Sequence, residues 1–233
     1  MSHVTLEEKN MAAIGFNVFR KFANEVKIVA KYHEGRPVEY WQEYRMAQVA
    51  EEVFQLATAW RMLGLKPQQN VAIMAPNSPR WATTFCGLLM INAVAVPVYP
   101  TLTAGEAAFI MRDANTRFAV VNNREQADKI LSLAGELPAL ERVFIMDGEA
   151  TPADDKMAPF TELLHMAKSK VDEREFAREI PSISGEDIGA IIYTSGTTGR
   201  PKGAVLTNTN FLSQRTALDC FNFSQNDIFL NHL

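Results

Sequence analysis

One stretch near the end of the chain combines the residue types that bind polyphosphates. Residues 194–203 contain four hydroxyl side chains, three glycines and the lysine Lys202, but no carboxylate. Glycines let a ligand approach the backbone closely, and successive N–H groups in such a turn can form a concavity that binds anions. We therefore expect a phosphate site whose contacts come from Thr194, Ser195, Gly196, Thr197, Thr198, Gly199 and Lys202.

This loop differs from the common glycine-rich phosphate loops. The P-loop pattern G-x-x-x-x-G-K-[ST] opens a helix, whereas Gly196 has Pro201 five residues later and Lys202 is followed by Gly203. The pattern G-x-G-x-x-G does not fit either, and an apolar, strand-like segment follows the loop. The alternative without a ligand is a surface hairpin rich in serine, threonine and glycine. The combination of glycine, hydroxyl and lysine favours the phosphate site.

The elements around the loop must hold it in place. The apolar run Ile188–Tyr193 is expected to form the strand that enters it, and Lys202–Leu206 the strand that leaves it. Thr207 or Asn208 would then cap a helix that runs to about Cys220, because both residue types accept hydrogen bonds from N–H groups at helix N-termini.

Further upstream, short apolar runs alternate with helical patterns. The expected strands are Val71–Met74, Val94–Tyr99, Phe118–Val121 and Val143–Met146. The expected helices are Met11–Ala30, Trp41–Leu63 with Gly64 as its C-cap, Arg80–Asn92, Glu106–Asp113, Arg124–Ala134 and Phe160–Lys170. Two polar stretches, Asp147–Pro159 and Val171–Gly185, are expected to be a loop and a solvated connection.

This alternation predicts an α/β fold with a largely parallel, doubly wound sheet. Strands that are almost entirely apolar are expected where helices cover both faces of a sheet. The predicted organisation is an N-terminal segment over residues 1–40, an α/β subdomain over 41–185, and a phosphate-loop strand pair with its helix over 186–233, which begins a second, truncated subdomain.

Composition excludes several classes of function. The net charge is -4 and no basic cluster stands out, which argues against nucleic acid as a partner. Cys86 and Cys220 are far apart and form no C-x-x-C pair, so neither a disulfide scaffold nor a cysteine metal site is expected, and a reducing cytosol suits the chain. The histidines share no metal-ligand spacing; they are His3, His33, His165 and His232.

One uncharged segment, Trp81–Gly105, is long enough to span a bilayer. Pro97 and Pro100 would break a helix there, and Asn92 interrupts its apolar character. We therefore expect a buried helix followed by a buried strand. The N-terminus also lacks a secretory pattern, because charged residues interrupt it early.

The loop resembles a family signature. Tyr193–Gly203 matches every fixed position of Y-T-S-G-T-T-G-x-P-K-G, the signature of the adenylate-forming superfamily of acyl-CoA synthetases, peptide-synthetase adenylation domains and luciferases. Ala75–Trp81 is similar to the family's N-x-P-E-W region, and Ala93–Thr101 resembles the form of A-V-x-V-P-x-Y-P-T typical of long-chain acyl-CoA synthetases. Two segments depart from the pattern: Gln68–Asn70 replaces a Gly-Asp turn, and Ile91-Asn92 replaces a Lys/Gly pair.

The resemblance implies an ATP-dependent, AMP-forming acid–thiol ligase. Such an enzyme adenylates a carboxylic acid, here a long-chain fatty acid, and transfers the acyl group to coenzyme A. ATP, Mg²⁺ and coenzyme A are the implied ligands. Lys202 is implied as the catalytic residue that supplies positive charge, and Thr194 as the Mg²⁺ ligand.

Other functions stay open at this point. Within enzymes, the alternative is another adenylating branch, such as an aryl-CoA ligase or a peptide-synthetase module. From a different class, the alternative is a non-catalytic nucleotide-binding fragment. The acid-binding pocket would separate the enzyme classes, and in the family most of it lies beyond Leu233.

The sequence ends where the family's L-P-L-x-H motif is expected, after the similar segment Asp227–Leu233. We therefore expect a truncated enzyme, without the later elements that hold adenine and ribose and without the small C-terminal domain. The isolated chain is expected to bind MgATP weakly and not to turn over. The expected location is the cytoplasm, with peripheral membrane association of the full-length protein, oligomeric state and chain length of the acid left open.

Overall fold

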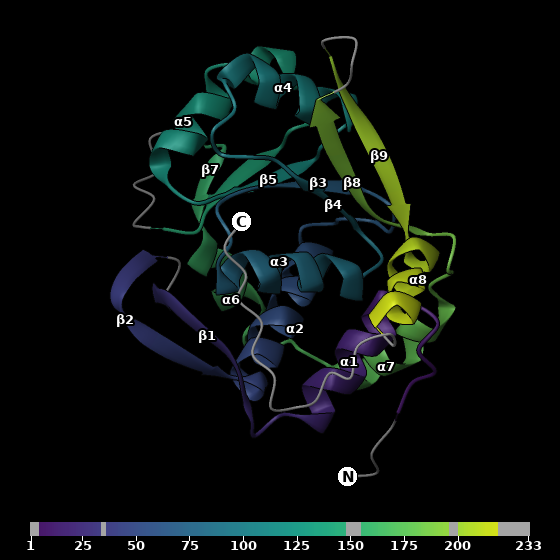
Figure 1. Ribbon diagram of the computed structural model, residues 1–233. Coiled ribbons are helices and arrows are strands. Elements are labelled where there is room, and N and C mark those ends of the chain that lie inside the picture. The colour runs from purple at the N-terminus through teal and green to yellow at the C-terminus, as the bar shows by residue number, and fades with distance from the viewer. Residues whose placement is uncertain (1–4, 34–35, 148–154, 196–199, 219–233) are drawn as a thin grey trace.

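A seven-stranded sheet with helices on both faces forms the body of the protein (Figure 1). The computed structural model describes residues 5–33, 36–147, 155–195 and 200–218. The strand order is β7-β6-β5-β3-β4-β8-β9, and every neighbouring pair is parallel except β8 and β9. The strands are β3 Asn70–Met74, β4 Val94–Pro97, β5 Phe118–Val121, β6 Arg142–Ile145, β7 Met157–Pro159, β8 Ile188–Ser195 and β9 Pro201–Thr207. This confirms the predicted α/β, largely parallel, doubly wound sheet.

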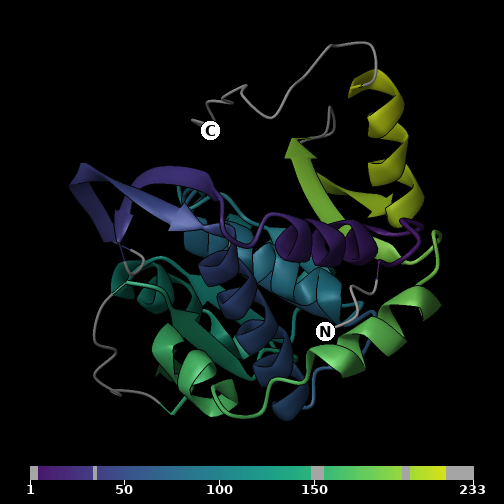
Figure 2. The same cartoon turned by 90° about the horizontal axis from the view of Figure 1, so that it is seen from below.

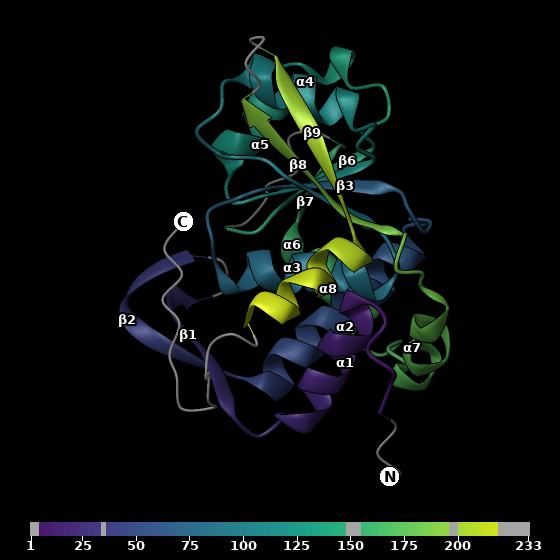
Figure 3. The ribbon, with the colours of Figure 1, turned by 45° about the vertical axis from the view of Figure 1, so that its right-hand side comes forward.

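The helices divide between the two faces of the sheet. One face is covered by α1 Met11–Lys21, α2 Met46–Met62, α3 Pro79–Met90, α6 Phe160–Ala167 and α7 Glu173–Glu179, with the 3₁₀ turn Ile180–Ser182. The other face is covered by α4 Ala104–Asp113 and α5 Arg124–Leu131, followed by the 3₁₀ turn Ala134–Glu136. The last helix, α8 Asn208–Leu218, lies beside α1 (Figure 3).

Burial on both faces explains why the central strands are apolar throughout. Val71 to Met74 of β3 have no exposed surface, and Ala72 pairs with Val96 on one side and Ala119 on the other. Alternate residues of each strand therefore feed two separate cores. The larger core is centred on Trp60, whose ring packs 5.6 Å from Phe118 and 5.4 Å from Phe144.

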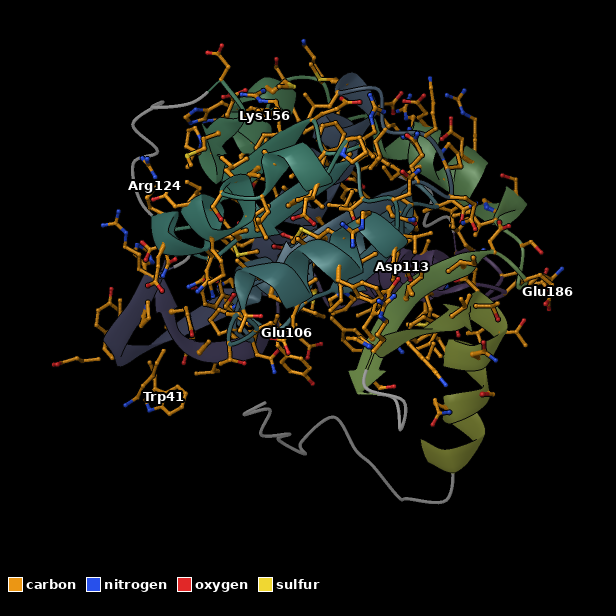
Figure 4. All side chains as sticks on the ribbon, turned by 90° about the horizontal axis from the view of Figure 1, so that it is seen from above. Trp41, Glu106, Asp113, Arg124, Lys156 and Glu186 are labelled. Carbon is orange, nitrogen blue, oxygen red and sulfur yellow. The ribbon has the colours of Figure 1, made fainter. Side chains whose placement is uncertain are left out.

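The N-terminal region differs from the prediction. The expected helices Met11–Ala30 and Trp41–Leu63 are partly wrong, because β1 Val26–His33 and β2 Arg36–Arg45 form a separate antiparallel ribbon. Valine, isoleucine, tyrosine and tryptophan at these positions favour strands. Figure 2 shows the ribbon extending from the helical layer, and Trp41 projects outward from it, 63% exposed (Figure 4).

Two short elements lie in stretches predicted to be irregular. β7 is in the expected loop Asp147–Pro159, where it pairs with β6 at the edge of the sheet. α7 is in the expected connection Val171–Gly185, and its Phe176 ring is buried against Phe54 at a centroid distance of 5.2 Å. The buried residues Phe176 and Ile180 are four positions apart, which is a helical spacing, but the charged residues around them and Pro181 obscure it in the sequence.

Several boundaries agree with the prediction. Gly64 follows α2 with φ 76°, the left-handed conformation that a C-terminal glycine supplies. Trp81–Gly105 contains most of α3, whose N-cap is Ser78, followed by β4. In the part of the chain that the structure describes, no helix has both the length and the apolarity to cross a membrane. The division of the chain at residues 40 and 185 stays a prediction.

Candidate phosphate-binding hairpin

β8 and β9 form an antiparallel hairpin at the edge of the sheet, with the predicted phosphate loop between them (Figure 3). Thr194 pairs with Lys202, and Tyr193 pairs with Gly203. Residues that oppose each other across an antiparallel pair project from the same face. The side chains of Thr194 and Lys202 therefore share one face of the hairpin, and both are exposed. Tyr193 projects from the opposite face.

The structure brings two of the predicted contact residues together. Thr194 and Lys202 lie at the base of the loop, where a hydroxyl and an ammonium group stand side by side. Gly196, Thr197, Thr198 and Gly199 lie outside the described residues, as does the side chain of Ser195. Among the described residues, no carboxylate or carbonyl group pairs with the exposed Lys202 ammonium.

Tyr193 connects the other face of the hairpin to helix α4. Its hydroxyl donates a hydrogen bond to Oδ2 of Asp113 over 2.6 Å. Burial raises the pKa of Tyr193, and the hydrogen bond and negative charge of Asp113 raise it further. The phenol therefore stays protonated and remains a donor. This pair could not be predicted from the sequence, because nothing in the local pattern links a helix end to a strand residue 80 positions later.

At position 203, the side chains of Ile191 and Tyr193 leave no room for a residue larger than glycine. A Cβ atom at this position would come within 2.8 Å of Cγ2 of Ile191 and 3.0 Å of Cζ of Tyr193. These distances are shorter than ordinary contacts, so any side chain here would displace its neighbours. The glycine thus allows the Tyr193 ring to lie flat across the strand pair on its way to Asp113.

The opposite end of β8 is held by a polar network. The side chain of Gln68 accepts a hydrogen bond from N of Ile188 at 3.0 Å and donates to its carbonyl oxygen at 3.2 Å. Gln68 also donates to Oδ1 of Asn92, which in turn donates from Nδ2 to Asp187 over 2.8 Å. Gln68 and Asn92 have φ of 61° and 57°. These are residues of the two segments that depart from the family pattern, and both have a structural role here.

Strand β9, which leaves the loop, is also held by hydrogen bonds at its far end. Thr207 caps α8, as predicted, since its hydroxyl accepts a hydrogen bond from N of Asn210 at 3.3 Å. The buried side chain of Asn208 accepts from N of Met11 at 2.9 Å and donates to the carbonyl oxygen of Asp187 at 3.2 Å. Both strands of the hairpin are therefore fixed at the end remote from the loop.

The remaining candidate residues lie away from this site. Cys86 packs against the larger core, and burial raises its pKa to about 11, which favours a core thiol over a nucleophile. In the described ranges, no three histidine, cysteine, aspartate or glutamate side chains gather as a metal site would require. Cys220, His3 and His232 fall outside those ranges.

With this geometry established, comparison with known proteins decides the family. A sequence model described as AMP-binding enzyme matches residues 20–233, which is most of the chain. The chain belongs to the AMP-binding enzyme family. Its predicted resemblance to adenylate-forming enzymes is thereby confirmed.

Curated relatives of this AMP-binding chain are long-chain fatty acid ligases. It is 29% identical over 174 residues to long-chain-fatty-acid–CoA ligase FadD15 of Mycobacterium tuberculosis, a match that covers 75% of this chain and 28% of that protein. It is 31% identical over 173 residues to long-chain-fatty-acid–CoA ligase ACSBG1 of Bos taurus, covering 74% of this chain and 23% of the relative. The chain thus spans about a quarter of the length of the curated relatives it matches.

Solved structures share the same fold. The anthranilate CoA ligase AuaEII, solved in complex with anthranoyl-AMP, superimposes with a TM-score of 0.71 at 25% identity, covering 89% of this chain and 36% of that one. The long-chain-fatty-acid-CoA ligase FadD1 of Archaeoglobus fulgidus superimposes with a TM-score of 0.72 at 21% identity, covering 94% of this chain and 40% of that one. The second likeness bears on the fold alone.

Proposed function

We propose that the β8–β9 hairpin binds the phosphate groups of ATP, and that the complete gene product is an AMP-forming ligase of a carboxylic acid and coenzyme A. One observation carries the proposal: Thr194 and Lys202 are direct cross-strand partners at the base of the signature loop. A hydroxyl and a lysine on one exposed face supply the short donor and the positive charge that a phosphate requires.

The chemistry follows from where charge develops. An oxygen of the acid's carboxylate attacks the α-phosphorus of ATP, and the bond to the leaving pyrophosphate breaks. We assign stabilisation of the pyrophosphate to Lys202 and to the backbone and hydroxyl donors of residues 194–199. One donor placed in advance at such a position contributes about 3 kcal/mol to lowering the barrier. No general base is needed, because a carboxylic acid is already ionised at neutral pH.

The second half-reaction releases AMP. The thiol of coenzyme A releases its proton to solvent and attacks the carbonyl carbon of the acyl-adenylate, which forms a thioester and expels AMP. Mg²⁺, when bound, would neutralise phosphate charge, and the Thr194 hydroxyl is an oxygen donor of the kind that this hard cation prefers. Thr194 is exposed beside Lys202, so its position at the loop base suits this role.

Among acids, we propose a long-chain fatty acid. The support is the segment Pro97–Thr101 and the names of the curated relatives, which are long-chain-fatty-acid–CoA ligases. The anthranilate CoA ligase among the structural neighbours favours an aromatic acid as the second candidate. Pyrophosphate release by the complete gene product, measured with palmitate, anthranilate and a panel of amino acids, separates these. Release with aromatic or amino acids but not with palmitate would contradict the fatty-acid proposal.

We further propose a cytoplasmic location, with peripheral contact at the inner face of a membrane. The support is the fatty acid substrate, which partitions into lipid, together with the cysteine usage of the chain. Cell fractionation of the complete gene product, followed by a high-salt wash of the membrane fraction, tests this. Protein that stays with membranes after the wash would contradict a merely peripheral contact.

The phosphate site itself is tested by calorimetric titration of this chain with MgATP. The variants Lys202→Ala and Thr194→Val should each weaken binding, the first by about thirtyfold as expected for loss of one charged hydrogen bond. Lys66→Ala is the matched control, because Lys66 is an exposed lysine at a different site, in the turn between α2 and β3. Equal affinity of all four proteins would contradict the assignment of the phosphates to this hairpin.

A further inference from the structure

The half of β8 that leads into the loop lies beyond the ladder that β8 forms with β4. β4 and β8 pair only through Ala95 and Ala190, so the segment that carries Tyr193 and Thr194 forms its ladder with β9 alone. A two-stranded hairpin is marginally stable by itself. Figures 1 and 3 show this end of the hairpin rising away from the central strands towards α4.

One side-chain hydrogen bond ties this segment to the body of the protein. Among the described residues of the hairpin between 190–195 and 200–206, only Tyr193 makes a side-chain hydrogen bond, and its acceptor is Asp113. The Tyr193 ring is 8% exposed and belongs to the core beneath α4 and α5. Asp113 lies beside the hairpin strands in Figure 4. The ring and its hydroxyl therefore fix the hairpin both by packing and by a directed bond.

The position of Asp113 is unfavourable for its own helix. It is the last residue of α4, and a carboxylate at a helix C-terminus is disfavoured by the negative end of the helix dipole. A local preference that is broken in this way points to a role elsewhere in the structure. The partner that the carboxylate gains is the Tyr193 hydroxyl, at 2.6 Å.

Alternation along the strand links this tie to the phosphate site. Tyr193 and Thr194 are consecutive and project from opposite faces, and their partners Gly203 and Lys202 do the same. Holding Tyr193 against α4 therefore sets the direction in which Thr194 and Lys202 point. Gly203 makes the arrangement possible, because it leaves room for the ring to cross the hairpin.

We infer that Tyr193 and Asp113 form a clamp that positions Thr194 and Lys202 for ATP, so that Tyr193 is a positioning residue of the phosphate site. This inference rests on the proposed function of the hairpin. The clamp itself is a property of the fold, so it can be tested separately from ATP binding.

Hydrogen exchange of this chain without ligand tests the clamp. Tyr193→Phe, which removes only the hydroxyl, and Asp113→Ala should each speed exchange of hairpin amides by about tenfold, and the double variant should add nothing further. Amides of α3 should be unaffected. Arg112→Ala is the matched control, because it breaks an exposed α4 ion pair to Glu136 that does not involve the hairpin. Unchanged hairpin exchange in Tyr193→Phe would overturn the clamp.

Kinetics of the complete gene product tests the positioning role. Tyr193→Phe and Asp113→Ala should raise KM for ATP by about tenfold and leave KM for palmitate unchanged, a split that general destabilisation would not produce. Asp113→Asn keeps an acceptor oxygen and should restore much of the loss. Faster hairpin exchange with an unchanged KM for ATP would overturn the positioning role and leave the clamp standing. A wild-type chain that binds no MgATP would count against the proposed function, while hydrogen exchange would still decide the clamp.

Discussion

The two ends of strand β8 are held in different ways. At its start, Gln68, Asn92 and Asp187 form a polar network that bonds to both backbone groups of Ile188. At its end, the bond from the Tyr193 hydroxyl to Asp113 is the one hydrogen bond made by a side chain of the described residues 190–195 and 200–206. At the start of the strand, the polar groups of that network form hydrogen bonds within the protein and so stabilise the fold. The second end leaves the Thr194 hydroxyl and the Lys202 ammonium exposed, so stability and the proposed phosphate binding belong to opposite ends of one strand.

The largest expected effect comes from filling the space over Gly203. Gly203→Val would press a branched side chain into Ile191 and the Tyr193 ring, where even a Cβ has contacts of 2.8 and 3.0 Å. We expect MgATP affinity to fall about a hundredfold or more, with a loss of about 1–3 kcal/mol in the free energy of unfolding from overpacking. Calorimetric titration and urea denaturation measure the two quantities.

Gly105→Val is the control for that variant. Gly105 lies in α4, and nothing is within 4 Å of the position its Cβ would take. Its affinity for MgATP should equal that of the wild type. If Gly203→Val bound MgATP normally, close packing at the loop end of the hairpin would not matter for the site.

At the start of β8, we expect substitutions to lower stability and to change MgATP affinity little. Combining Gln68→Ala with Asn92→Ala removes the polar network and leaves alanines at positive φ. The free energy of unfolding should fall by about 3 kcal/mol, from the lost hydrogen bonds and the backbone strain. MgATP affinity, measured well below the unfolding temperature, should change less than about threefold. A large loss of affinity without a loss of stability would break the contrast between the two ends.

Lys202→Ala should weaken MgATP binding and leave stability unchanged. The side chain is exposed and bonds to nothing in the described residues, so the free energy of unfolding should stay within about 0.5 kcal/mol of the wild type. Since the same variant is expected to weaken MgATP binding by about thirtyfold, it should separate binding from stability. A clear drop in the urea midpoint would show that Lys202 supports the fold instead.

The smallest effect is expected from Asn92→Gly. Glycine removes the strain of φ 57° but loses the hydrogen bonds to Gln68 and Asp187. These contributions oppose each other, so the net change in unfolding free energy should be within about 1 kcal/mol. Urea denaturation beside Asn92→Ala isolates the two contributions. If the glycine variant were as unstable as the alanine variant, backbone strain at this position would be unimportant.

Much of the fold could be predicted because its signals are local. The runs around Val71–Met74 and Phe118–Val121 are apolar throughout, which is typical of strands covered on both faces, and their expected bounds agree with β3 and β5 within one residue. The ribbon β1–β2 could not be predicted in the same way. Most positions of β2 are exposed, and the parts of β1 and β2 that lie within Met11–Ala30 and Trp41–Leu63 carry a mixed pattern that predicts a helix. Pairing of the two strands with each other, together with their strand-favouring residue types, decided those residues.

By itself, the sequence determined the family and predicted the chemistry: the hydroxyls, glycines and Lys202 of Tyr193–Gly203 form a specific pattern whose residue types predict a phosphate ligand. Only the tertiary structure decided how that loop is supported. The contacts between Tyr193 and Asp113, and between Gln68 and Ile188, join residues separated by 80 and 120 positions. Such contacts leave no periodic trace in a single sequence, because each depends on the packing of whole elements against one another.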